Sequence, residues 1–330
     1  MKPYIYITRK LPDEVTQSIQ TKFQIKMWEH EDIPCPKEVL LSEAKKASAL
    51  LTMLSDSIDE SIFAAGDQIK VVANLAVGFD NIDLNAANKA GVAVCNTPDV
   101  LTDTTADLTF SLLMATARRV VEAAEFVKEG QWKSWSPLLL AGHDIHHKTL
   151  GIVGMGKIGE TLAKRATGFD MNILYHNRTR KQEAESAYGV IYSTFDELVE
   201  KSDFIVCLTP LTEETNRMFS REVFQKMKSS AIFVNASRGP VVDEQALYEA
   251  LVAGEIAGAG LDVFEKEPIS ADHPLLTLSN VVALPHIGSS SVETRTAMMK
   301  LCVENIEAVL NGKQPQTLVN KDWKPLVNVF

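Results

Sequence analysis

Gly154-Met155-Gly156-Lys157-Ile158-Gly159 is the stretch that decides the fold of this 330-residue chain. It follows an apolar run at residues 149–153 and precedes residues 160–165, whose residue types favour the start of a helix. A strand, a glycine turn and a helix in this order are the context that a dinucleotide-binding motif requires. The glycines permit a tight turn, let a phosphate approach bare backbone, and let helix and strand pack without an intervening Cβ. We therefore predict that all six residues cradle a pyrophosphate; the alternative is a chance glycine turn.

The motif lies near the middle of the chain, so the predicted dinucleotide-binding unit is inserted within another domain. Short β-rich runs separated by helical segments come before it, at residues 4–8, 24–28, 49–52, 71–75 and 92–95. A second series of expected strands covers residues 149–153, 171–175, 204–208, 231–235, 258–263 and 281–284. This alternation predicts an α/β fold with two Rossmann-like domains, of which the inserted one is a doubly wound parallel sheet.

Two longer helices are expected where the chain passes between the domains. Residues 106–118 read as an apolar helix, with candidate N-caps at residues 102–105. The amphipathic stretch 291–310 follows the last expected strand and should return the chain to the first domain. The predicted boundaries are 101–287 for the inserted domain, and 1–100 with 288–330 for the surrounding domain.

The composition favours a protein that acts on small molecules. The chain has 33 basic and 43 acidic residues, a net charge of −10, and no polybasic block. This argues against nucleic acid and anionic membranes as partners. The cysteines are far apart and have neither zinc-site nor disulfide-framework spacing: Cys35, Cys95, Cys207 and Cys302. No run approaches membrane length and the N-terminus does not read as a signal peptide, so we expect a cytoplasmic protein without a bound metal.

The end of the second strand after the glycine motif predicts which nicotinamide cofactor binds. An NAD site needs an acidic residue there to accept hydrogen bonds from the ribose hydroxyls. Here the strand ends Tyr175-His176-Asn177-Arg178-Thr179-Arg180, with two arginines and no acid. Because arginine offers a two-pronged, charge-assisted contact to a 2′-phosphate, NADPH is the preferred cofactor and NADH the alternative. A solvated basic loop is the plainer interpretation of the same residues.

Three polar side chains follow later strands, whose carboxyl ends face the ligand crevice of a doubly wound sheet. Hydride addition to a ketone builds negative charge on its oxygen, so the site needs a proton donor, and His286 fits that role. Glu267 is the candidate carboxylate that holds the histidine ring. Arg238 could grip a carboxylate substrate and polarise its carbonyl. Taken singly, each residue also has a structural explanation, as an ion pair, a solvated acid or a capping histidine.

The chain resembles the D-isomer-specific 2-hydroxyacid dehydrogenase family, in its branch of glyoxylate/hydroxypyruvate and 2-ketogluconate reductases. The matching segments run nearly from end to end, at residues 76–83, 96–101, 154–159, 237–239, 260–264 and 285–288. An ordered set of this kind is highly specific. The resemblance implies a flavodoxin-like substrate domain around the NAD(P)-binding domain. It also implies homodimers, with an arm at about 102–142 that reaches the partner subunit.

The resemblance assigns roles residue by residue. It makes His286 the acid/base, pairs Glu267 with it, and places Arg238 on the substrate carboxylate and carbonyl. The backbone of Val77 and Gly78 is implied to bind the substrate carboxylate. Further members of the implied site are Leu54 near the substrate, Asp262 near the nicotinamide amide, and the cofactor-binding residues Asn177, Arg178, Thr179, Pro210, Thr215, Ala236 and Gly288.

The tryptophans of the implied arm and three histidines that follow it each have two interpretations. Trp135, with Trp132 nearby, lies in the implied arm, and it either approaches the partner's substrate pocket or only packs at the interface. His143, His146 and His147 precede a strand without acidic or cysteine ligands at zinc spacing, which favours a polar loop over a metal site.

The favoured function is NADPH-dependent reduction of glyoxylate, hydroxypyruvate or 2-keto-D-gluconate to the D-2-hydroxy acid. One alternative is a cofactor-sensing, corepressor-like binding protein of the same fold, which would bind the dinucleotide without turnover. A short phosphoglycerate dehydrogenase is another. The sequence does not choose among the 2-oxo acids, because the width of the pocket depends on loop positions.

Overall fold

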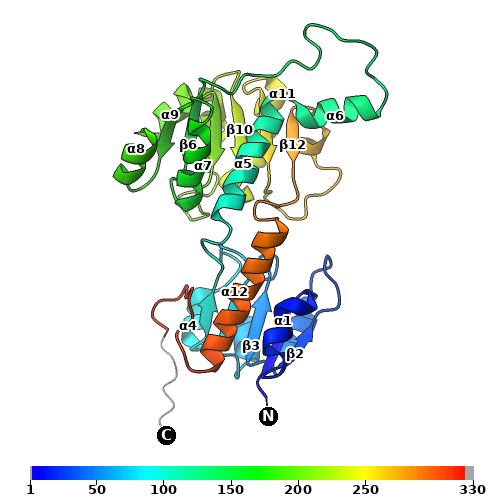
Figure 1. Cartoon of the computed structure of the whole chain (residues 1–330), viewed down its shortest axis with the longest axis vertical. Helices are drawn as coiled ribbons and strands as arrows, with labels where there is room; N and C mark the ends of the chain where they lie inside the picture. Colours follow the sequence, from blue (N-terminus) through cyan, green and yellow to red (C-terminus); the bar gives the residue numbers. More distant parts are fainter. Residues whose placement is uncertain (1, 324–330) are drawn as a thin grey trace. The chain divides into compact units, whose positions relative to one another are not determined.

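The computed structural model describes residues 2–323, whose contacts divide the chain into two compact units. Thr102–Ser290 forms the inserted unit, and the chain before Thr102 and after Ser290 forms the first unit. Each unit has one parallel sheet with helices packed on it (Figure 1). The predicted fold class, α/β with two Rossmann-like domains, is confirmed.

The sheet of the first unit has the strand order β2-β1-β3-β4-β5, the order of flavodoxin-like folds. Its strands are β1 Tyr4–Ile7, β2 Gln24–Met27, β3 Ala49–Thr52, β4 Val71–Asn74 and β5 Ala93–Cys95. Every residue of β3, β4 and β5 is buried, which explains their unbroken apolar runs. The helices of this unit are α1 Asp13–Gln20, α2 Lys37–Ala44, α3 Glu60–Ala65, α4 Leu84–Lys89 and α12 Val292–Leu310.

Helix α12 brings the end of the chain back into the first unit, where it packs on β4 and α1. Its N-cap is Ser291, whose Oγ accepts a hydrogen bond from the Thr294 N–H at 3.1 Å. The expected amphipathic helix at 291–310 is therefore confirmed.

The inserted unit has the strand order β12-β11-β10-β9-β6-β7-β8. Its strands are β6 Thr149–Val153, β7 Asn172–His176, β8 Ile191–Tyr192, β9 Phe204–Cys207, β10 Ile232–Asn235, β11 Gly258–Leu261 and β12 Val281–Ala283. Strand order reverses between β6 and β9, and ligands of doubly wound sheets bind beyond the carboxyl ends of the strands at such a point. All the predicted strands are present; the two-residue edge strand β8 was not predicted.

Helices cover both faces of this sheet. On one face, Leu112 of α5 (Thr102–Ala117) and Leu162 of α7 (Lys157–Thr167) pack with Ile152 of β6. On the other, the covering helices are α9 Phe195–Lys201, α10 Arg221–Lys226 and α11 Glu244–Ala253. The remaining helix on the sheet is α8 Gln182–Tyr188. Helix α5 begins at Thr102, so the prediction that residues 102–105 precede it as caps was wrong: they form its first turn.

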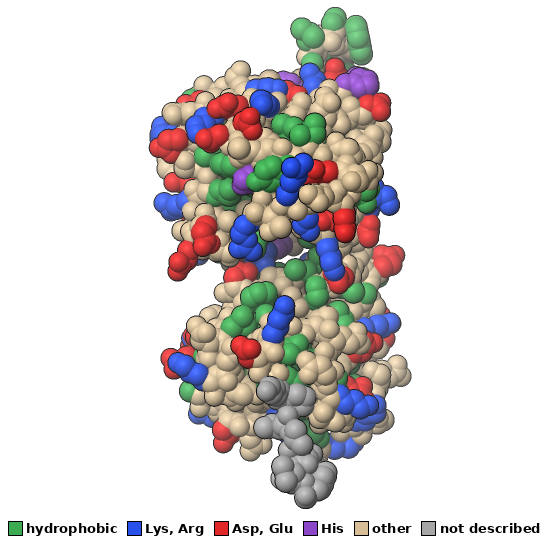
Figure 2. Space-filling model, turned by 90° about the vertical axis from the view of Figure 1, so that its left-hand side faces the viewer, with side chains coloured by type: hydrophobic (Ala, Val, Ile, Leu, Met, Phe, Trp, Pro, Cys, Tyr) green, Lys and Arg blue, Asp and Glu red, His purple; other side chains and the backbone are tan. Residues whose placement is uncertain are grey.

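Beyond α5 the chain forms an arm, made of α6 (Val120–Lys128) and the loop that follows it (Figure 1). No residue of α6 is buried within this chain. Large hydrophobic side chains gather at the end of the arm, at the top of Figure 2; Trp135 is 78% exposed and Leu138 is 81% exposed. The end of the arm therefore exposes large apolar side chains in the single chain.

Across residues 2–323, the helices are too short or too polar to cross a membrane. The three histidines at 143, 146 and 147 lie in the loop before β6, and no cluster of metal-ligating side chains occurs in that described part of the chain.

Candidate active site

The three glycines of the turn after β6 have different surroundings. Gly154 has a φ of +105°, and a Cβ there would lie 2.7 Å from the backbone carbon of Leu208, the residue after β9. A Cβ on Gly159 would lie 2.4 Å from the carbonyl oxygen of Gly154. A Cβ on Gly156 would meet nothing within 4 Å. Gly154 and Gly159 are therefore required by packing, whereas Gly156 faces open space.

That open space lies at the N-terminus of α7, of which Gly156 is the N-cap and Lys157 the first residue. Helix N-termini carry unpaired N–H groups and a partial positive charge, which together bind phosphate. Met155 is fully buried, and its N–H donates to Asn177 Oδ1 at 3.3 Å. Ile158 is half-buried within the first turn. The turn therefore fits the pyrophosphate of a dinucleotide.

The loop after β7 has one arginine that is already paired. Arg180 donates from Nε and Nη2 to the two carboxylate oxygens of Glu185, at 2.7 and 2.8 Å. This contact, with a hydrogen bond from Tyr175, lowers the pKa of Glu185 to about 2. Arg178 is exposed beside it, and Asn177 Nδ2 donates to the carbonyl of Thr179 at 2.8 Å. Glu185 thus pairs with Arg180, and Arg178 lies outside that pair.

The loop after β9 is closed by a threonine. Thr215 Oγ1 donates to the carbonyl of Pro210 at 2.6 Å and accepts from the Thr212 N–H at 2.8 Å. These bonds hold the two residues that the resemblance places beside the cofactor in one compact turn.

Arg238 lies in a turn fixed by the last residue of β10. Asn235 is 1% exposed; its Nδ2 donates to the Arg238 carbonyl at 3.0 Å, and its Oδ1 accepts from the Ser237 N–H at 3.1 Å. The Arg238 guanidinium donates to the Ser237 carbonyl at 2.8 Å. Ala236, between these residues, donates its N–H to the carbonyl of Cys207 at 3.3 Å. The turn is thus tied to both β10 and β9.

Gly239 brings the Arg238 turn against the segment that follows β11. A Cβ on Gly239 would lie 1.8 Å from the backbone carbon of Phe264, so only glycine permits this approach. Glu267 belongs to that segment, and its Oε1 accepts a hydrogen bond from the Phe264 N–H at 3.0 Å. The two backbone segments that present Arg238 and Glu267 are therefore in direct contact.

Glu267 and His286 form a close polar pair in the site. His286 Nδ1 lies 2.7 Å from Glu267 Oε2, and the two side chains are 24% and 29% exposed respectively. Burial raises the pKa of the Glu267 carboxyl, but the hydrogen bond and the charge of His286 outweigh it. Arg238 also acts to lower the pKa of Glu267, whose net value lies below its ordinary range.

Asp262, the residue after β11, holds the loop that carries His286. It is 2% exposed and accepts hydrogen bonds from the N–H groups of Ile287 at 2.7 Å and of Gly288 at 2.8 Å. His286 itself has a φ of +54°, in the left-handed region that non-glycine residues avoid. The two hydrogen bonds from the following residues stabilise that conformation. Burial is the main reason why the pKa of Asp262 is raised.

The predicted substrate-binding residues of the first unit lie at the carboxyl ends of its strands. Leu54 is half-buried in the loop after β3, and Val77 and Gly78 are half-buried in the loop after β4. The Val77 carbonyl accepts from Asn96 Nδ2 at 2.7 Å, and the Gly78 carbonyl accepts from Asn74 Nδ2 at 3.0 Å.

The structure brings Arg238, Glu267 and His286 together within the inserted unit, at the same sheet edge as the glycine turn. Sequence reasoning missed the two residues that shape this cluster, Asn235 and Gly239. A signal for Asn235 was present, since an asparagine two residues before a serine at a strand end often forms a side-chain-closed turn. The contact of Gly239 with Phe264 joins distant parts of the chain and leaves no local signal.

The chain is similar to known proteins over nearly its whole length. Residues 110–288 match the family model of the D-isomer specific 2-hydroxyacid dehydrogenase NAD-binding domain. The chain is 49% identical over 323 residues to a glyoxylate reductase of Korarchaeum cryptofilum, covering 98% of this chain and 97% of that protein. A solved structure from Thermus thermophilus matches with a TM-score of 0.90 at 42% identity, covering 96% of this chain and 99% of that one.

A second similar structure was solved with a cofactor and a small acid bound. It is an NADPH-dependent glyoxylate/hydroxypyruvate reductase from Sinorhizobium meliloti in complex with NADP and malonate. The match has a TM-score of 0.85 at 31% identity, and it covers 98% of both chains.

Proposed function

Since the chain belongs to the D-isomer-specific 2-hydroxyacid dehydrogenase family, we propose that it reduces small 2-oxo acids to D-2-hydroxy acids, with NADPH as preferred cofactor. Membership makes it an NAD(P)-dependent oxidoreductase acting on a CH–OH group. Glyoxylate, hydroxypyruvate and 2-keto-D-gluconate are the candidate substrates. Relatives described as glyoxylate reductases favour the first of these.

The observation that carries the proposal is the 2.7 Å contact between His286 Nδ1 and Glu267 Oε2, beside Arg238. Glu267 accepts a hydrogen bond from Nδ1–H of His286 and orients the ring, so that Nε2–H is left to protonate the carbonyl oxygen of the substrate. The guanidinium of Arg238 binds the substrate carboxylate and polarises the carbonyl. The nicotinamide cofactor, when bound, supplies the hydride, so that a 2-oxo acid, NADPH and H⁺ give the 2-hydroxy acid and NADP⁺.

The first unit contributes backbone donors in this proposal. The N–H groups of Val77 and Gly78 bind the substrate carboxylate, and Leu54 lines the site beside them. This assignment is supported by the position of both loops at the carboxyl edge of the sheet. The side-chain amides of Asn96 and Asn74 donate there to the carbonyls of Val77 and Gly78.

The cofactor assignment rests on the glycine turn and on the loop after β7. The six residues 154–159 hold the pyrophosphate, and Asn177, Arg178 and Thr179 take the 2′-phosphate. Arg178 is the cation for that role, because Arg180 is engaged by Glu185. The remaining proposed contacts to the cofactor are Pro210, Thr215, Ala236, Asp262 and Gly288.

The arm supports the proposal of a homodimer. Helix α6 has no buried residue in the single chain, and Trp132, Trp135 and Leu138 on the loop after it are exposed. A second copy that covered this surface would remove their apolar area from water.

Initial rates test the function. NADPH and NADH oxidation is measured with glyoxylate, hydroxypyruvate, 2-keto-D-gluconate and 3-phosphohydroxypyruvate, alongside His286→Ala. We expect turnover with NADPH and a loss of about 100-fold or more in the variant, with NADPH binding retained. Activity confined to 3-phosphohydroxypyruvate would favour a phosphoglycerate dehydrogenase. Tight cofactor binding without turnover of any substrate would favour a cofactor-sensing binding protein.

A further inference from the structure

Two loops at the carboxyl edge of the first unit's sheet carry the residues proposed to bind substrate. Residues 53–56 follow β3 and contain Leu54; residues 75–81 follow β4 and contain Val77 and Gly78. Loops of this kind lack ladder hydrogen bonds, so their conformation depends on other contacts. In this unit those contacts include a backbone hydrogen bond from the Ile58 N–H to the Asn81 carbonyl at 2.9 Å, and several hydrogen bonds from side chains.

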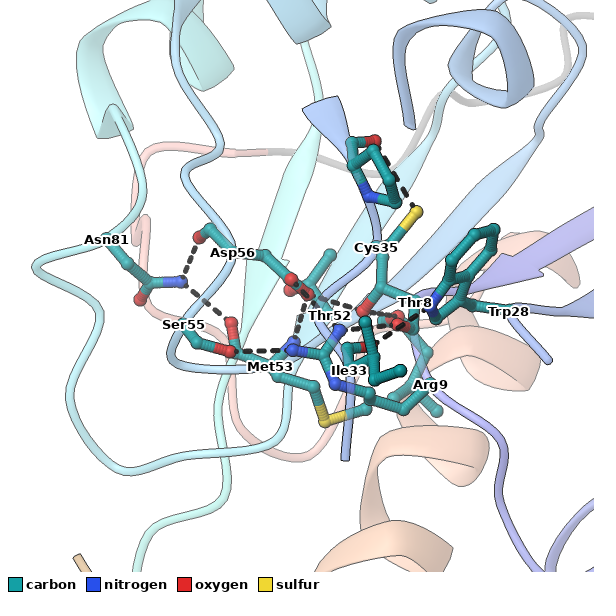
Figure 3. A network of polar contacts seen from close by, with 12 residues as sticks. Thr8, Arg9, Trp28, Ile33, Cys35, Thr52, Met53, Ser55, Asp56 and Asn81 are labelled. Atoms are coloured by element: carbon teal, nitrogen blue, oxygen red, sulfur yellow. Dashed lines mark hydrogen bonds and ion pairs between the residues drawn. The ribbon is translucent and has the colours of Figure 1, made fainter. Parts of the chain in front are cut away.

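The side chain of Asn81 joins the two loops (Figure 3). Its Nδ2 donates to the carbonyls of Met53 at 3.1 Å and of Asp56 at 2.8 Å, at the two ends of the first loop. Its Oδ1 accepts from Asn74 Nδ2 at 3.0 Å, and the same amide group of Asn74 donates to the Gly78 carbonyl at 3.0 Å. One asparagine therefore links the loop of Leu54 to the carbonyl of Gly78.

The first loop is held from its other side by a buried ion pair (Figure 3). Asp56, 5% exposed, accepts from Thr8 Oγ1 and from the Met53 N–H, the latter at 2.8 Å, and lies 3.5 Å from Nη1 of Arg9. Arg9 also donates from Nη2 to Ser55 Oγ at 3.0 Å. Burial raises the pKa of Asp56, and its hydrogen bonds oppose that shift. Thr8 and Arg9, which follow β1, anchor this side of the loop. The side chain of Asn81, with the backbone bond between Ile58 and Asn81, holds its other side beside the segment of Gly78.

We propose that Asn81 is a positioning residue for substrate binding, which fixes the Leu54 loop relative to the backbone of Val77 and Gly78. The inference rests on the proposed function, since those residues bind the 2-oxo acid there. Asn81 does not touch substrate in this scheme. Its loss loosens both loops and weakens binding of the carboxylate in ground state and transition state alike, so KM rises and kcat does not fall with it.

The chain offers a matched control in Asn320. Asn320 is a buried asparagine of the first unit, whereas Asn81 is half-buried, and its amide also makes three hydrogen bonds: Nδ2 donates to Val92 O at 2.9 Å and Asn88 Oδ1 at 2.8 Å, and Oδ1 accepts from the Val94 N–H at 2.8 Å. These partners lie around β5 and not in either loop. Asn320→Ala therefore removes a comparable set of hydrogen bonds from the first unit without touching either loop.

The test compares the full-length wild type with Asn81→Ala and Asn320→Ala. We expect Asn81→Ala to raise KM for glyoxylate by about 10-fold or more, with kcat and the Kd for NADPH within about two-fold of wild type. Amide hydrogen exchange should rise selectively in peptides that cover 53–56 and 75–80. Asn320→Ala should leave KM and those peptides unchanged.

Equal KM values for the two variants, or a fall in kcat at constant KM, would overturn the inference. If wild type reduces no 2-oxo acid, the proposed function fails, and hydrogen exchange still decides whether Asn81 holds the loops: unchanged exchange at 53–56 and 75–80 rejects it. Asn81→Asp adds a further check. It keeps the acceptor for Asn74 and loses both donors, so exchange should rise mainly at 53–56; a rise confined to 75–80 contradicts the assigned bonds.

Discussion

His286 Nδ1 and Glu267 Oε2 are 2.7 Å apart, and each member of this pair is held by a different backbone contact. The Phe264 N–H fixes Glu267, and Asp262 fixes the loop after His286. The pair is thus preorganised within the inserted unit. Preorganised charges stabilise a developing charge without paying for reorganisation during the reaction.

Glu267→Gln should lower the rate of reduction. The amide keeps the shape and the acceptor for Phe264, but it loses the carboxylate that accepts the hydrogen bond from Nδ1–H of His286. We expect kcat to fall about 100-fold at neutral pH, because the histidine ring loses the contact that orients it. Glu265→Gln is the control, because Glu265 pairs with Arg217 and lies two residues away. Equal kcat values for Glu267→Gln and wild type would show that the carboxylate does not act on the histidine.

The same pair makes stability depend on pH. The pKa of Glu267 is lowered in the folded protein, so the carboxylate stabilises the fold at pH values above its ordinary pKa. That contribution is lost as the pH falls through the lowered value. Thermal unfolding of wild type and Glu267→Gln should therefore differ most near neutrality and converge in acid; a constant difference down to acid pH would contradict the lowered pKa.

Gly239→Ala should separate the Arg238 turn from the Glu267 segment. A Cβ there would lie 1.8 Å from the Phe264 backbone carbon, so one segment must move. We expect a loss of stability on the order of 3 kcal/mol and a large loss of activity. Gly254→Ala is the control: Gly254 has a φ of +69° with nothing within 4 Å, so it should cost only about 1 kcal/mol and leave kcat intact. Chemical denaturation and steady-state rates measure both.

Gly156→Ala and Gly159→Ala should separate cofactor binding from packing. Gly156 has a φ of −82° and open space before its Cβ, so alanine there should leave thermal stability unchanged. It should raise the Kd for NADPH about 10-fold, because the methyl group stands where a phosphate approaches. Gly159→Ala meets the Gly154 carbonyl oxygen at 2.4 Å and should lower both stability and affinity. Calorimetric titration and unfolding distinguish the two; equal affinity of Gly156→Ala and wild type would place the pyrophosphate elsewhere.

The periodic parts of the fold could be predicted from the sequence, because each buried parallel strand is an apolar run of ordinary length. Strand β8 could not, since it has two exposed residues, Ile191 and Tyr192, at the sheet edge. The start of α5 was placed too late because threonines and an aspartate favour caps locally. In the structure residues 102–105 continue into the helix, and Arg165 of α7 pairs with Asp103 across the helix surface.

The candidate site was predictable only as a set of residue types at strand ends. Arg238, Glu267 and His286 each follow a strand, and the ends of parallel strands meet at one edge. Their supports come from contacts between segments far apart in the chain, such as Gly239 with Phe264. The same holds in the first unit. Asn81 lies in the segment 76–83, which matches the family, but its hydrogen bond to the Met53 carbonyl joins two loops that are distant in the sequence and could not be predicted.

Arg178→Ala should weaken NADPH and spare NADH. Arg178 is the exposed cation of the loop after β7 that is not held by Glu185, and a charge-assisted contact to the 2′-phosphate is worth about 1.5–3 kcal/mol. We therefore expect KM for NADPH to rise about 10-fold to 100-fold, with KM for NADH within about two-fold. Arg180→Ala is the matched control, because its exposed pair with Glu185 contributes little, and KM for NADPH should change by less than about two-fold. Steady-state rates with both cofactors measure these KM values. If Arg180→Ala raised KM for NADPH more than Arg178→Ala, the 2′-phosphate would bind Arg180, which would then have to leave Glu185 when the cofactor binds.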